Sequence, residues 1–377
     1  MNNFSISDLP KGAYIHMIGI GGISMSGIAE MLLNFGYKVS GSDAKPSGLT
    51  DRLKQNGAEI FIGQSADNIK NPDAVCYTAA ISPDNPELVK AKTLGIPVVE
   101  RAVFLGALLE KYKYPIAVAG THGKTTTSSM LSLVLLAAHK DPTILIGGEL
   151  SQIGGNYHIG GNEYLPFEAC EYVESFLHFK PFVSIITNIE EDHLDYFKDL
   201  NHIITSFVKF ASLTSDNGCN IVCIDENTTQ SIVQNVKKKA VTYALNNKNA
   251  DYTAENITLE KNGCPTFDIF NKDRKVLSVS LNVAGDHNIC NALGVTAACE
   301  FLGIEPEYIK SGLEEFRGAK RRFDRLGKTE TGVDVVDDYA HHPTEIKTTL
   351  ETAKKMGYNN VWVAFQPHTY TLSLIHI

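Results

Sequence analysis

Short apolar runs alternate with longer segments of mixed polarity along almost the whole chain. This alternation is typical of α/β domains, in which buried, mostly parallel strands are connected by helices. In the first region we expect a helix from about Met25 to Phe35, and the region closes near Lys111. Its apolar runs predict strands at residues 13–18, 37–40, 59–62, 74–78 and 97–99.

A second region of the same kind extends from residue 112 to residue 323. The segments on either side of Lys261-Asn262-Gly263 alternate between apolar and polar residues, which favours hairpins, and a helix is expected near residues 288–301. Strands are predicted at residues 115–119, 164–168, 183–187 and 220–224.

The last region begins near Asp324 and has the pattern of a strand, a helix and a second strand. The strands are predicted at residues 333–337 and 361–365. Roughly fifty residues are too few for an independent α/β sheet, so this region is expected to be an incomplete domain. The sequence thus predicts an α/β fold with domains at residues 1–111, 112–323 and 324–377.

The bulk properties exclude several classes of protein. A net charge of −9 argues against a general nucleic-acid binder, which would present a basic face. No apolar run reaches the roughly 18 residues of a transmembrane helix, and no secretory signal is visible at the N-terminus. The seven cysteines include no C-x-x-C pair, and Cys219 and Cys223 lie in an apolar stretch that predicts core thiols. We therefore expect a cytoplasmic protein without membrane or nucleic-acid partners.

The most informative stretch runs from Gly120 to Thr127 and reads Gly-Thr-His-Gly-Lys-Thr-Thr-Thr. It lies between a predicted strand and a predicted helix, so its backbone N–H groups and the positive end of the helix dipole would hold a phosphate. Lys124 can reach the outer phosphates, and the Thr125 hydroxyl can bind Mg²⁺. Because Val118 stands where the usual G-x-x-x-x-G-K-[ST] loop begins with glycine, this shortened variant indicates a narrower group of nucleotide enzymes.

A second glycine-rich turn, Gly19-Ile20-Gly21-Gly22-Ile23-Ser24, follows the first predicted strand. It resembles a dinucleotide-binding fingerprint in which Ser24 takes the place of the third glycine. Asp43 lies at the end of the next strand, where an acid can bind a ribose hydroxyl. Three explanations of this turn stay open: binding of NAD, binding of a nucleotide sugar, and simple close packing of a helix on a strand. The residues favour the nucleotide sugar.

Acidic and imidazole side chains follow two other predicted strands. Glu171 comes after the strand expected beside the phosphate loop, where an acid can hold Mg²⁺ directly or through water. Because Glu168 and Glu174 are close, a solvated acidic turn is the alternative. His193 lies in the polar segment 187–195, at a strand end where α/β folds place ligands, and is a candidate metal ligand or a charge near phosphate.

Polar clusters in the later part of the chain allow two interpretations each. His287 and Asn291 begin a predicted helix and could hydrogen-bond a base, although helix capping explains this segment about equally well. Lys320-Arg321-Arg322 could neutralise phosphate charge in a transition state or could be a solvated run. The block 337–343 combines acids, a phenol and two imidazoles, which suits positioning of a substrate amine or a nucleotide better than a structural metal.

Taken together, these segments resemble those of one family, the Mur ligases of peptidoglycan synthesis. The resemblance covers essentially the whole chain up to Thr371, and Tyr339-Ala340-His341-His342-Pro343-Thr344-Glu345 is similar to the block of the alanine-adding member. The matching segments are residues 19–27, 119–127, 187–189, 192–195, 285–288, 321–323, 337–346 and 365–371.

The resemblance implies an N-terminal Rossmann-like domain for a UDP-sugar, a central P-loop ATPase domain with a parallel sheet, and a partial C-terminal Rossmann-like domain for an amino acid. It implies that the carboxylate of UDP-N-acetylmuramate attacks ATP to give an acyl phosphate, from which the amine of L-alanine displaces phosphate. A free carboxylate is a poor acceptor for an amine, so this activation makes chemical sense. Positioning and charge neutralisation carry most of phosphoryl transfer.

The same resemblance assigns roles to individual residues. Thr125, Glu171 and His193 match the Mg²⁺ ligands, and Tyr339 and His341 match residues near the amino acid. The residues expected in catalysis are Lys124, His193, Arg322 and His341. Those expected to bind ATP are Gly120, Thr121, His122, Gly123, Lys124, Thr125, Thr126, His287 and Asn291. Those expected to bind the UDP-sugar are Gly19, Gly21, Gly22, Ser24, Met25, Ser26 and Asp43.

The sequence departs from the family pattern in three places. Ser24 replaces a common glycine, and Cys170 replaces one acid of the segment that carries Glu171. Leu372 stands where the family normally has an arginine, and the rest of the third domain is expected to be missing. We therefore expect these 377 residues to bind the UDP-sugar but to ligate it poorly or not at all.

Three alternatives compete with this interpretation. Another amide ligase of the same fold, such as a folylpolyglutamate synthase type, is the nearest, and the UDP-sugar segment from Gly19 to Gly27 argues against it. An NAD-dependent oxidoreductase would leave Lys124 and Thr125 without a role. A nucleotide-binding fragment without catalytic activity is the third, because part of the alanine site is expected to be absent.

Overall fold

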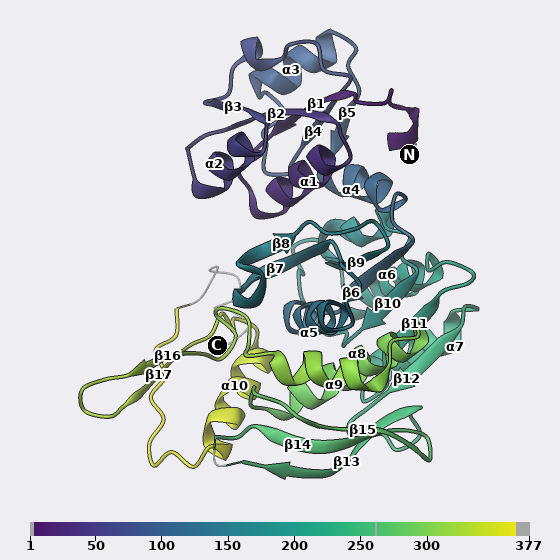
Figure 1. The fold of residues 1–377 in the computed structure, drawn as a ribbon, viewed down its shortest axis with the longest axis vertical. Coiled ribbons are helices and arrows are strands. Elements are labelled where there is room, and N and C mark those ends of the chain that lie inside the picture. Colours follow the sequence, from purple (N-terminus) through teal and green to yellow (C-terminus); the bar gives the residue numbers. More distant parts are fainter. Residues whose placement is uncertain (1–3, 261, 367–377) are drawn as a thin grey trace.

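The N-terminal region forms a five-stranded parallel sheet covered by helices (Figure 1). Its elements are η1 (Ile6–Asp8), β1 (Tyr14–Ile18), α1 (Ile23–Asn34), β2 (Lys38–Asp43), α2 (Gly48–Gln55), β3 (Glu59–Ile62), η2 (Ala66–Asn68), β4 (Ala74–Tyr77), α3 (Pro86–Thr93), β5 (Val98–Glu100) and α4 (Arg101–Leu109). The strand order β3-β2-β1-β4-β5 reverses direction at β1, and such sheets bind ligands beyond the carboxyl ends of the strands at that point. All five predicted strands are confirmed. The computed structural model describes residues 4–260 and 262–366.

The central region is built on a ten-stranded mixed sheet. Its elements are β6 (Tyr114–Ala119), α5 (Lys124–Ala137), β7 (Ile144–Leu150), η3 (Ser151–Ile153), β8 (Gly155–His158), β9 (Tyr164–Glu168), η4 (Tyr172–His178), β10 (Val183–Ile186), α6 (Leu200–Ser212), β11 (Cys219–Cys223), α7 (Asn227–Asn235), β12 (Ala240–Tyr243), β13 (Tyr252–Leu259), β14 (Pro265–Asn271), β15 (Arg274–Ser280), α8 (Asp286–Phe301) and α9 (Pro306–Glu315). The strand order is β15-β14-β13-β12-β11-β10-β6-β9-β7-β8.

The expected parallel sheet extends from β7 to β13, and antiparallel strands are added at both of its edges. β8 pairs antiparallel with β7 at one edge, while β14 and β15 form successive antiparallel pairs at the other. The predicted hairpins are therefore confirmed, although Lys261 itself lies outside the described residues. The sheet is mixed because the amphipathic segments after residue 250 return directly as hairpins, without a crossover helix.

Helices cover both faces of the central sheet. Side chains of β6 alternate between two cores, with Ala117 and Ala119 in one and Ile116 and Val118 in the other. The first core includes residues of α4, α6 and α7, and the second includes residues of α5, α8 and α9. The phosphate loop after β6 is therefore anchored by a strand that is buried on both sides.

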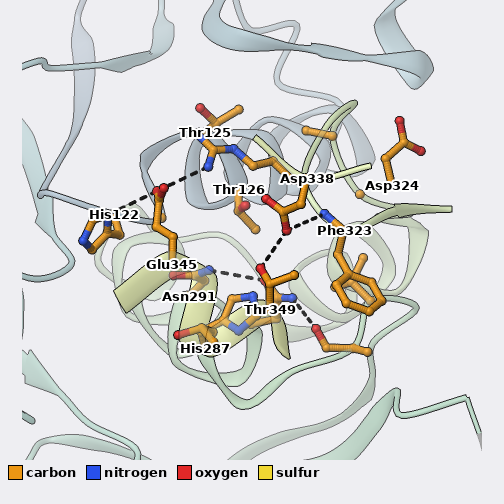
Figure 2. A pocket seen from close by; sticks show the side chains of 18 of the residues that line it. His122, Thr125, Thr126, His287, Asn291, Phe323, Asp324, Asp338, Glu345 and Thr349 are labelled. Atoms are coloured by element: carbon orange, nitrogen blue, oxygen red, sulfur yellow. Dashed lines mark hydrogen bonds and ion pairs between the residues drawn. The ribbon is translucent and has the colours of Figure 1, made fainter. Parts of the chain in front are cut away.

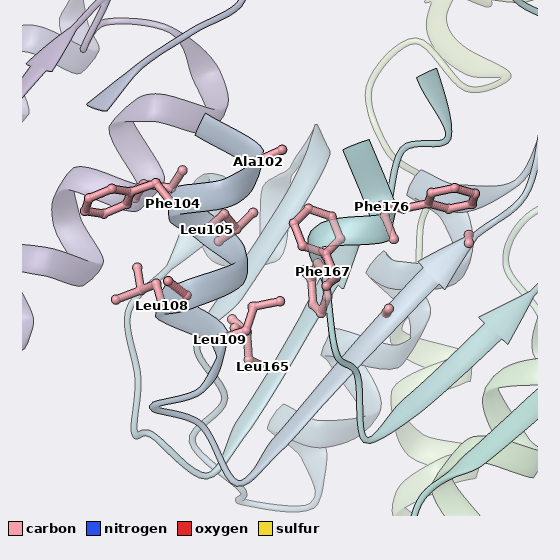
Figure 3. Packing of buried hydrophobic residues seen from close by; sticks show 14 of the residues in the cluster. Ala102, Phe104, Leu105, Leu108, Leu109, Leu165, Phe167 and Phe176 are labelled. Atoms are coloured by element: carbon pink, nitrogen blue, oxygen red, sulfur yellow. The ribbon is translucent and has the colours of Figure 1, made fainter. Parts of the chain in front are cut away.

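Helix α4 connects the first sheet to the central one. Phe104, Leu105 and Leu108 of α4 are buried in one cluster with Phe167 of β9 (Figure 3). The helix approaches the central region so closely at Gly106 that a Cβ there would lie 2.2 Å from the carbonyl oxygen of His178. The predicted boundary near Lys111 therefore falls just after a helix that packs on both regions, and it remains a prediction.

The C-terminal part consists of a two-stranded antiparallel sheet and one helix. Its elements are β16 (Asp324–Lys328), β17 (Asp334–Asp337) and α10 (Pro343–Lys355). The predicted strand at 333–337 is confirmed as β17. The prediction of a strand at 361–365 is wrong: the described residues 361–366 form no strand, and Trp362 is 93% exposed. A strand needs a hydrogen-bonded neighbour, and β17 pairs with β16 instead.

The cysteines and the helix lengths agree with what the sequence predicts. Cys219 and Cys223 are buried, which confirms them as core residues, and all seven cysteines are free thiols. Across residues 4–260 and 262–366, no helix is long and apolar enough to cross a bilayer. Residues 367–371 of the last matching segment, and Leu372, lie outside the described residues.

Candidate active site

The loop between β6 and α5 can be formed only with glycines at its two ends. Gly120 has φ 143° and Gly123 has φ 83°, values that other residues rarely adopt. A Cβ on Gly120 would lie 2.0 Å from the Thr187 hydroxyl oxygen. No side chain caps the first turn of α5, which begins at Lys124, so its N–H groups are available to a phosphate.

The segment after β10 holds the backbone of this loop. The Thr187 hydroxyl donates to the carbonyl oxygen of His122 at 2.6 Å, and the His122 N–H donates to the Asn188 side-chain oxygen at 2.7 Å. The N–H of Glu190 donates to the Thr121 hydroxyl at 2.9 Å. Thr187 and Asn188, which stood out in the sequence as possible ligand-binding residues, therefore position the loop.

Lys124 lies at the start of α5 with its amine close to an acid of the next strand connection. Its Nζ donates to the carbonyl oxygen of Thr121 at 3.1 Å and to the Glu171 carboxylate at 3.1 Å. Burial acts to lower the pKa of Lys124, but the charge of Glu171, its hydrogen bond to Lys124 and the nearby Glu168 and Cys170 together outweigh burial, and the pKa is raised. Lys124 is therefore a cation at neutral pH, as charge neutralisation of a phosphate requires.

Three groups that can bind a cation lie together beside Lys124. The His193 Nε2 is 3.9 Å from the Glu171 carboxylate and 3.8 Å from the Asp192 carboxylate. Thr125, the third predicted Mg²⁺ ligand, instead donates to Glu168 at 3.1 Å. Two carboxylates fit Mg²⁺, which prefers oxygen ligands. Asp192 was missed, although its position directly before His193 is a signal that the sequence carries.

A cavity of about 580 Å³ opens between the phosphate loop, α8 and the C-terminal part (Figure 2). His287 and Asn291 lie on its α8 wall, where a Cβ on Gly123 would be 3.0 Å from the Asn291 side-chain oxygen. The predicted ATP-binding residues that line it are His122, Gly123, Thr125, Thr126, His287 and Asn291. Gly120, Thr121 and Lys124 belong to the same loop, so the predicted set is brought together.

Glu345 of α10 reaches the cavity from the C-terminal part and contacts three predicted site residues. Its carboxylate lies 3.1 Å from His122 Nδ1 (Figure 2). It also lies 3.4 Å from an Arg322 guanidinium nitrogen and accepts from the His341 N–H at 3.2 Å. The sequence analysis assigns no role to Glu345, which appears there only as part of the block from Tyr339 to Glu345. Its role depends on contact with His122, a residue 223 positions away in the chain, and no local sequence pattern predicts such a contact.

The charges of this cluster shift each other's pKa values. Burial acts to lower the pKa of His122, but hydrogen bonds to Glu190 and Glu345 raise it to about 9. Burial acts to raise the pKa of Glu345, yet its hydrogen bond to His122 and the nearby charges hold it well below its ordinary value. At neutral pH the two side chains therefore form an ion pair between the phosphate loop and α10.

The three consecutive basic residues do not form one patch. Lys320 pairs with Glu149 at 2.7 Å, Arg321 with Asp337 at 3.6 Å, and Arg322 with Glu345 at 3.4 Å. Lys320 and Arg322 line the cavity, whereas Arg321 lies over the Tyr339 ring. Arg322 is thus the member of the run that lies beside both the cavity and Glu345.

His341 lies next to this cluster, outside the residues that line the cavity. Its Nδ1 is 3.0 Å from the carbonyl oxygen of Tyr339, and the rings of the two residues are 5.1 Å apart. Its backbone N–H donates to Glu345. The two residues expected near the amino acid therefore lie together, behind the carboxylate that faces the phosphate loop.

The first glycine turn has its own geometry at the carboxyl end of β1. The Gly21 N–H donates to the Asp43 carboxylate at 2.9 Å, and Gly19 has φ 82°. The Ser24 hydroxyl accepts from the Arg101 guanidinium at 3.2 Å. Met25 and Ser26 are buried, and the N–H groups of Gly22 and Ser26 donate to the carbonyl oxygens of Gly19 and Gly22. The UDP-sugar set remains a prediction.

Comparisons with known proteins place this geometry in a family. Residues 14–113 match a model of the "Mur ligase family, catalytic domain", residues 118–299 the "Mur ligase middle domain" and residues 321–372 the "Mur ligase, glutamate ligase domain". The chain belongs to the Mur ligase family. The family resemblance predicted from the motifs is thereby confirmed.

Individual Mur ligases are similar over most of the chain. A UDP-N-acetylmuramate–L-alanine ligase of Acetivibrio thermocellus is 52% identical over 98% of this chain and 79% of its own, and that of Clostridium perfringens is 51% identical over 95% and 78%. The crystal structure of a UDP-N-acetylmuramate–alanine ligase from Thermotoga maritima matches with a TM-score of 0.78 at 34% identity, covering 91% of this chain and 78% of its own. These relatives carry the name of the alanine-adding member, as the block from Tyr339 to Glu345 predicted.

Proposed function

We propose that this Mur ligase joins L-alanine to the carboxylate of UDP-N-acetylmuramate, using ATP, in the synthesis of peptidoglycan precursors. The observation that carries the proposal is the cavity in which the phosphate loop faces His287 and Asn291 on one side and Arg322 and Glu345 on the other. The relatives at about half identity, named for this reaction, support the same substrates.

In the proposed reaction, a carboxylate oxygen of the UDP-sugar attacks the γ-phosphorus of ATP, and the bond to ADP breaks. The N–H groups at the start of α5 hold the phosphates, and Lys124 neutralises charge on the outer ones. Arg322, which lines the same cavity, adds a second cation to the transferred phosphoryl group. The product is an acyl phosphate, a mixed anhydride with a good leaving group.

Mg²⁺ is proposed to bind at Glu171 and Asp192, next to His193, and Thr125 of the phosphate loop is proposed as a further ligand. When bound, the ion would neutralise the charge of the ATP phosphates and hold them in line for transfer. The residues themselves fit this role because the two carboxylates and the Lys124 amine converge on the same end of β9 and β10. Glu168 orients the Thr125 hydroxyl by accepting its hydrogen bond at 3.1 Å.

The second step is proposed to take place next to α10. The unprotonated amine of L-alanine attacks the acyl carbon, phosphate leaves with its bonding pair, the nitrogen loses one proton to solvent, and an amide forms. His341 and Tyr339 are proposed to lie near this amine, because His341 donates to Glu345 and the Tyr339 ring lies against His341. A nucleotide-binding fragment without ligase activity is the alternative, and it predicts binding without turnover.

The test is a phosphate-release assay in which ATP, UDP-N-acetylmuramate and each amino acid are omitted in turn. The 377 residues are compared with a chain that carries the complete C-terminal portion of a relative. Release that requires all three substrates, with L-alanine preferred to glycine and L-serine, supports the proposal. ATP turnover that is indifferent to the UDP-sugar or to the amino acid in both chains contradicts it.

A further inference from the structure

Two cysteines and an aspartate converge behind the nucleotide cavity, outside the proposed active site. The sulfurs of Cys223 and Cys290 are 3.6 Å apart, and the Asp225 carboxylate is 4.0 Å from the first and 3.9 Å from the second. Cys223 ends β11, Asp225 begins the following loop and Cys290 lies on α8. Three separate pieces of the chain thus bring three potential metal ligands together.

The distances suit a thiophilic cation better than a disulfide. A disulfide holds its sulfurs about 2.05 Å apart, far closer than these two. Zinc–thiolate bonds of about 2.3 Å place two sulfurs of a tetrahedral site roughly 3.8 Å apart. The separation of 3.6 Å between Cys223 and Cys290 lies near that value, and the carboxylate completes a triangle of similar edges.

Asp225 is held in place by the loop that follows β12. Its Oδ2 accepts the N–H of Leu245 at 2.8 Å, and its Oδ1 accepts the N–H groups of Asn246 and Asn247 at 2.8 Å and 3.0 Å. Oδ1 already accepts two N–H groups, whereas Oδ2 accepts only one, so these bonds leave room for a cation on Oδ2. Such outer hydrogen bonds orient the ligands of protein metal sites.

The cluster is partly open to solvent. Cys223 is 5% exposed, whereas Cys290 and Asp225 are partly exposed, so a cation can reach the cluster at these two residues. The pKa of Cys290 is raised well above its ordinary value by its hydrogen bond with Cys223 and by burial. The thiol is therefore protonated at neutral pH, and a bound cation would have to displace its proton.

We propose that Cys223, Asp225 and Cys290 form a binding site for a thiophilic divalent cation such as Zn²⁺, with the fourth position taken by water. Binding forms two sulfur–metal bonds and releases both thiol protons to solvent. The cation would tie β11 to the first turns of α8, the helix that carries His287 and Asn291 into the nucleotide cavity. The site shares no residue with the proposed Mg²⁺ position. Mg²⁺ has little affinity for thiolates, so the two sites would also select different cations.

The chain provides a matched control. Cys219 lies on the same strand as Cys223, and Cys299 lies on the same helix as Cys290; both are buried and neither belongs to the cluster. The variant C223A/C290A removes the proposed ligands, and C219A/C299A removes two thiols from the same two elements. Single C290A, at the partly exposed position, serves if the first double variant does not fold.

The experiment titrates the reduced, metal-free 377-residue chain with Cd²⁺ in excess Mg²⁺, following thiolate-to-metal charge-transfer absorption and thermal unfolding. We expect one tight equivalent and a raised melting temperature for the wild type and C219A/C299A, with affinity at least tenfold weaker in C223A/C290A or C290A. Absence of the absorption in the wild type would overturn the proposal. So would equal binding by C223A/C290A, or a Cys223–Cys290 disulfide that forms in place of the metal site.

Discussion

His122 Nδ1 lies 3.1 Å from a carboxylate oxygen of Glu345, although 223 residues separate the two in the chain. His122 belongs to the phosphate loop, and Glu345 belongs to α10 in the C-terminal part. Both side chains are only 13% exposed, so the pair is shielded from solvent and from salt. The contact connects the proposed ATP site with the segment proposed to bind the amino acid.

Removing the charge of Glu345 should destabilise this connection. In Glu345→Gln, protonated His122 and Arg322 lose a shared anion in a largely buried place. Because an unpaired buried charge is costly, we expect the free energy of unfolding in urea to fall by about 2 kcal/mol. Glu351→Gln, on the same helix but 58% exposed and 4.0 Å from Lys347, should change it by less than about 0.5 kcal/mol. Equal effects of the two substitutions would contradict the proposed role of Glu345.

The stability that His122 contributes should depend on pH. Because its pKa rises from 6.5 to about 9 on folding, its contribution is complete below pH 6.5 and is lost as the pH rises through 9. The upper limit is roughly 3 kcal/mol at 1.36 kcal/mol per unit. The difference in unfolding free energy between the wild type and His122→Gln should therefore be largest near pH 6 and disappear above about pH 9. A difference that stays constant across this range would rule out the raised pKa.

Lys124→Met should abolish most of the turnover without unfolding the protein. The substitution keeps the length of the side chain and removes the cation that faces Glu171 and the N-terminus of α5. In the chain that carries the complete C-terminal portion of a relative, we expect phosphate release to slow by roughly 10²–10⁴-fold, because preorganised charge is a large part of phosphoryl-transfer catalysis. Lys310→Met, at an exposed lysine of α9, is the control and should keep wild-type rates. Wild-type turnover in Lys124→Met would refute the assignment.

Gly120→Ala should disrupt the loop itself. Its φ of 143° and the 2.0 Å approach of the Thr187 hydroxyl leave no room for a methyl group. We expect a loss of about 2 kcal/mol in unfolding free energy and weaker ATP binding in calorimetry. Gly48→Ala, at the start of α2 with open space around it, should be neutral within about 0.5 kcal/mol. Unchanged ATP affinity in Gly120→Ala would contradict the loop geometry.

Glu171→Gln tests the proposed Mg²⁺ position. Loss of one carboxylate beside Asp192 and His193 should raise the Mg²⁺ concentration for half-maximal phosphate release by roughly 10- to 100-fold. Glu174→Gln is a matched control, since Glu174 pairs with Lys209 and Ser206 away from this cluster. If both variants keep the wild-type Mg²⁺ dependence, Glu171 does not hold the ion.

The local geometry of the phosphate loop could be predicted from the sequence because it depends on neighbours in the chain. A strand, two glycines and a helix start determine where Lys124 and Thr125 lie. The partners of those residues could not be predicted in the same way. Thr125 contacts Glu168, and Thr187 holds the backbone of His122, because β9 and β10 flank β6 in the sheet.

The C-terminal part was the least predictable. The composition of residues 361–365 is typical of a strand, but these residues form none. A strand also needs a neighbour with which to form hydrogen bonds, and β17 pairs with β16. The basic run was also misleading, since Lys320, Arg321 and Arg322 diverge to three different acids. Both outcomes depend on which distant segments meet, and that is a property of the fold.

The central claim is that ATP activates the carboxylate of UDP-N-acetylmuramate at the Gly120–Thr127 loop. The most direct measurement uses substrate labelled with oxygen-18 in that carboxylate, in a single turnover with excess enzyme, ATP and L-alanine, and determines the mass of the released phosphate. An acyl phosphate requires one labelled oxygen to pass from the carboxylate to each phosphate when the amide forms. Amide product accompanied by unlabelled phosphate would contradict the account.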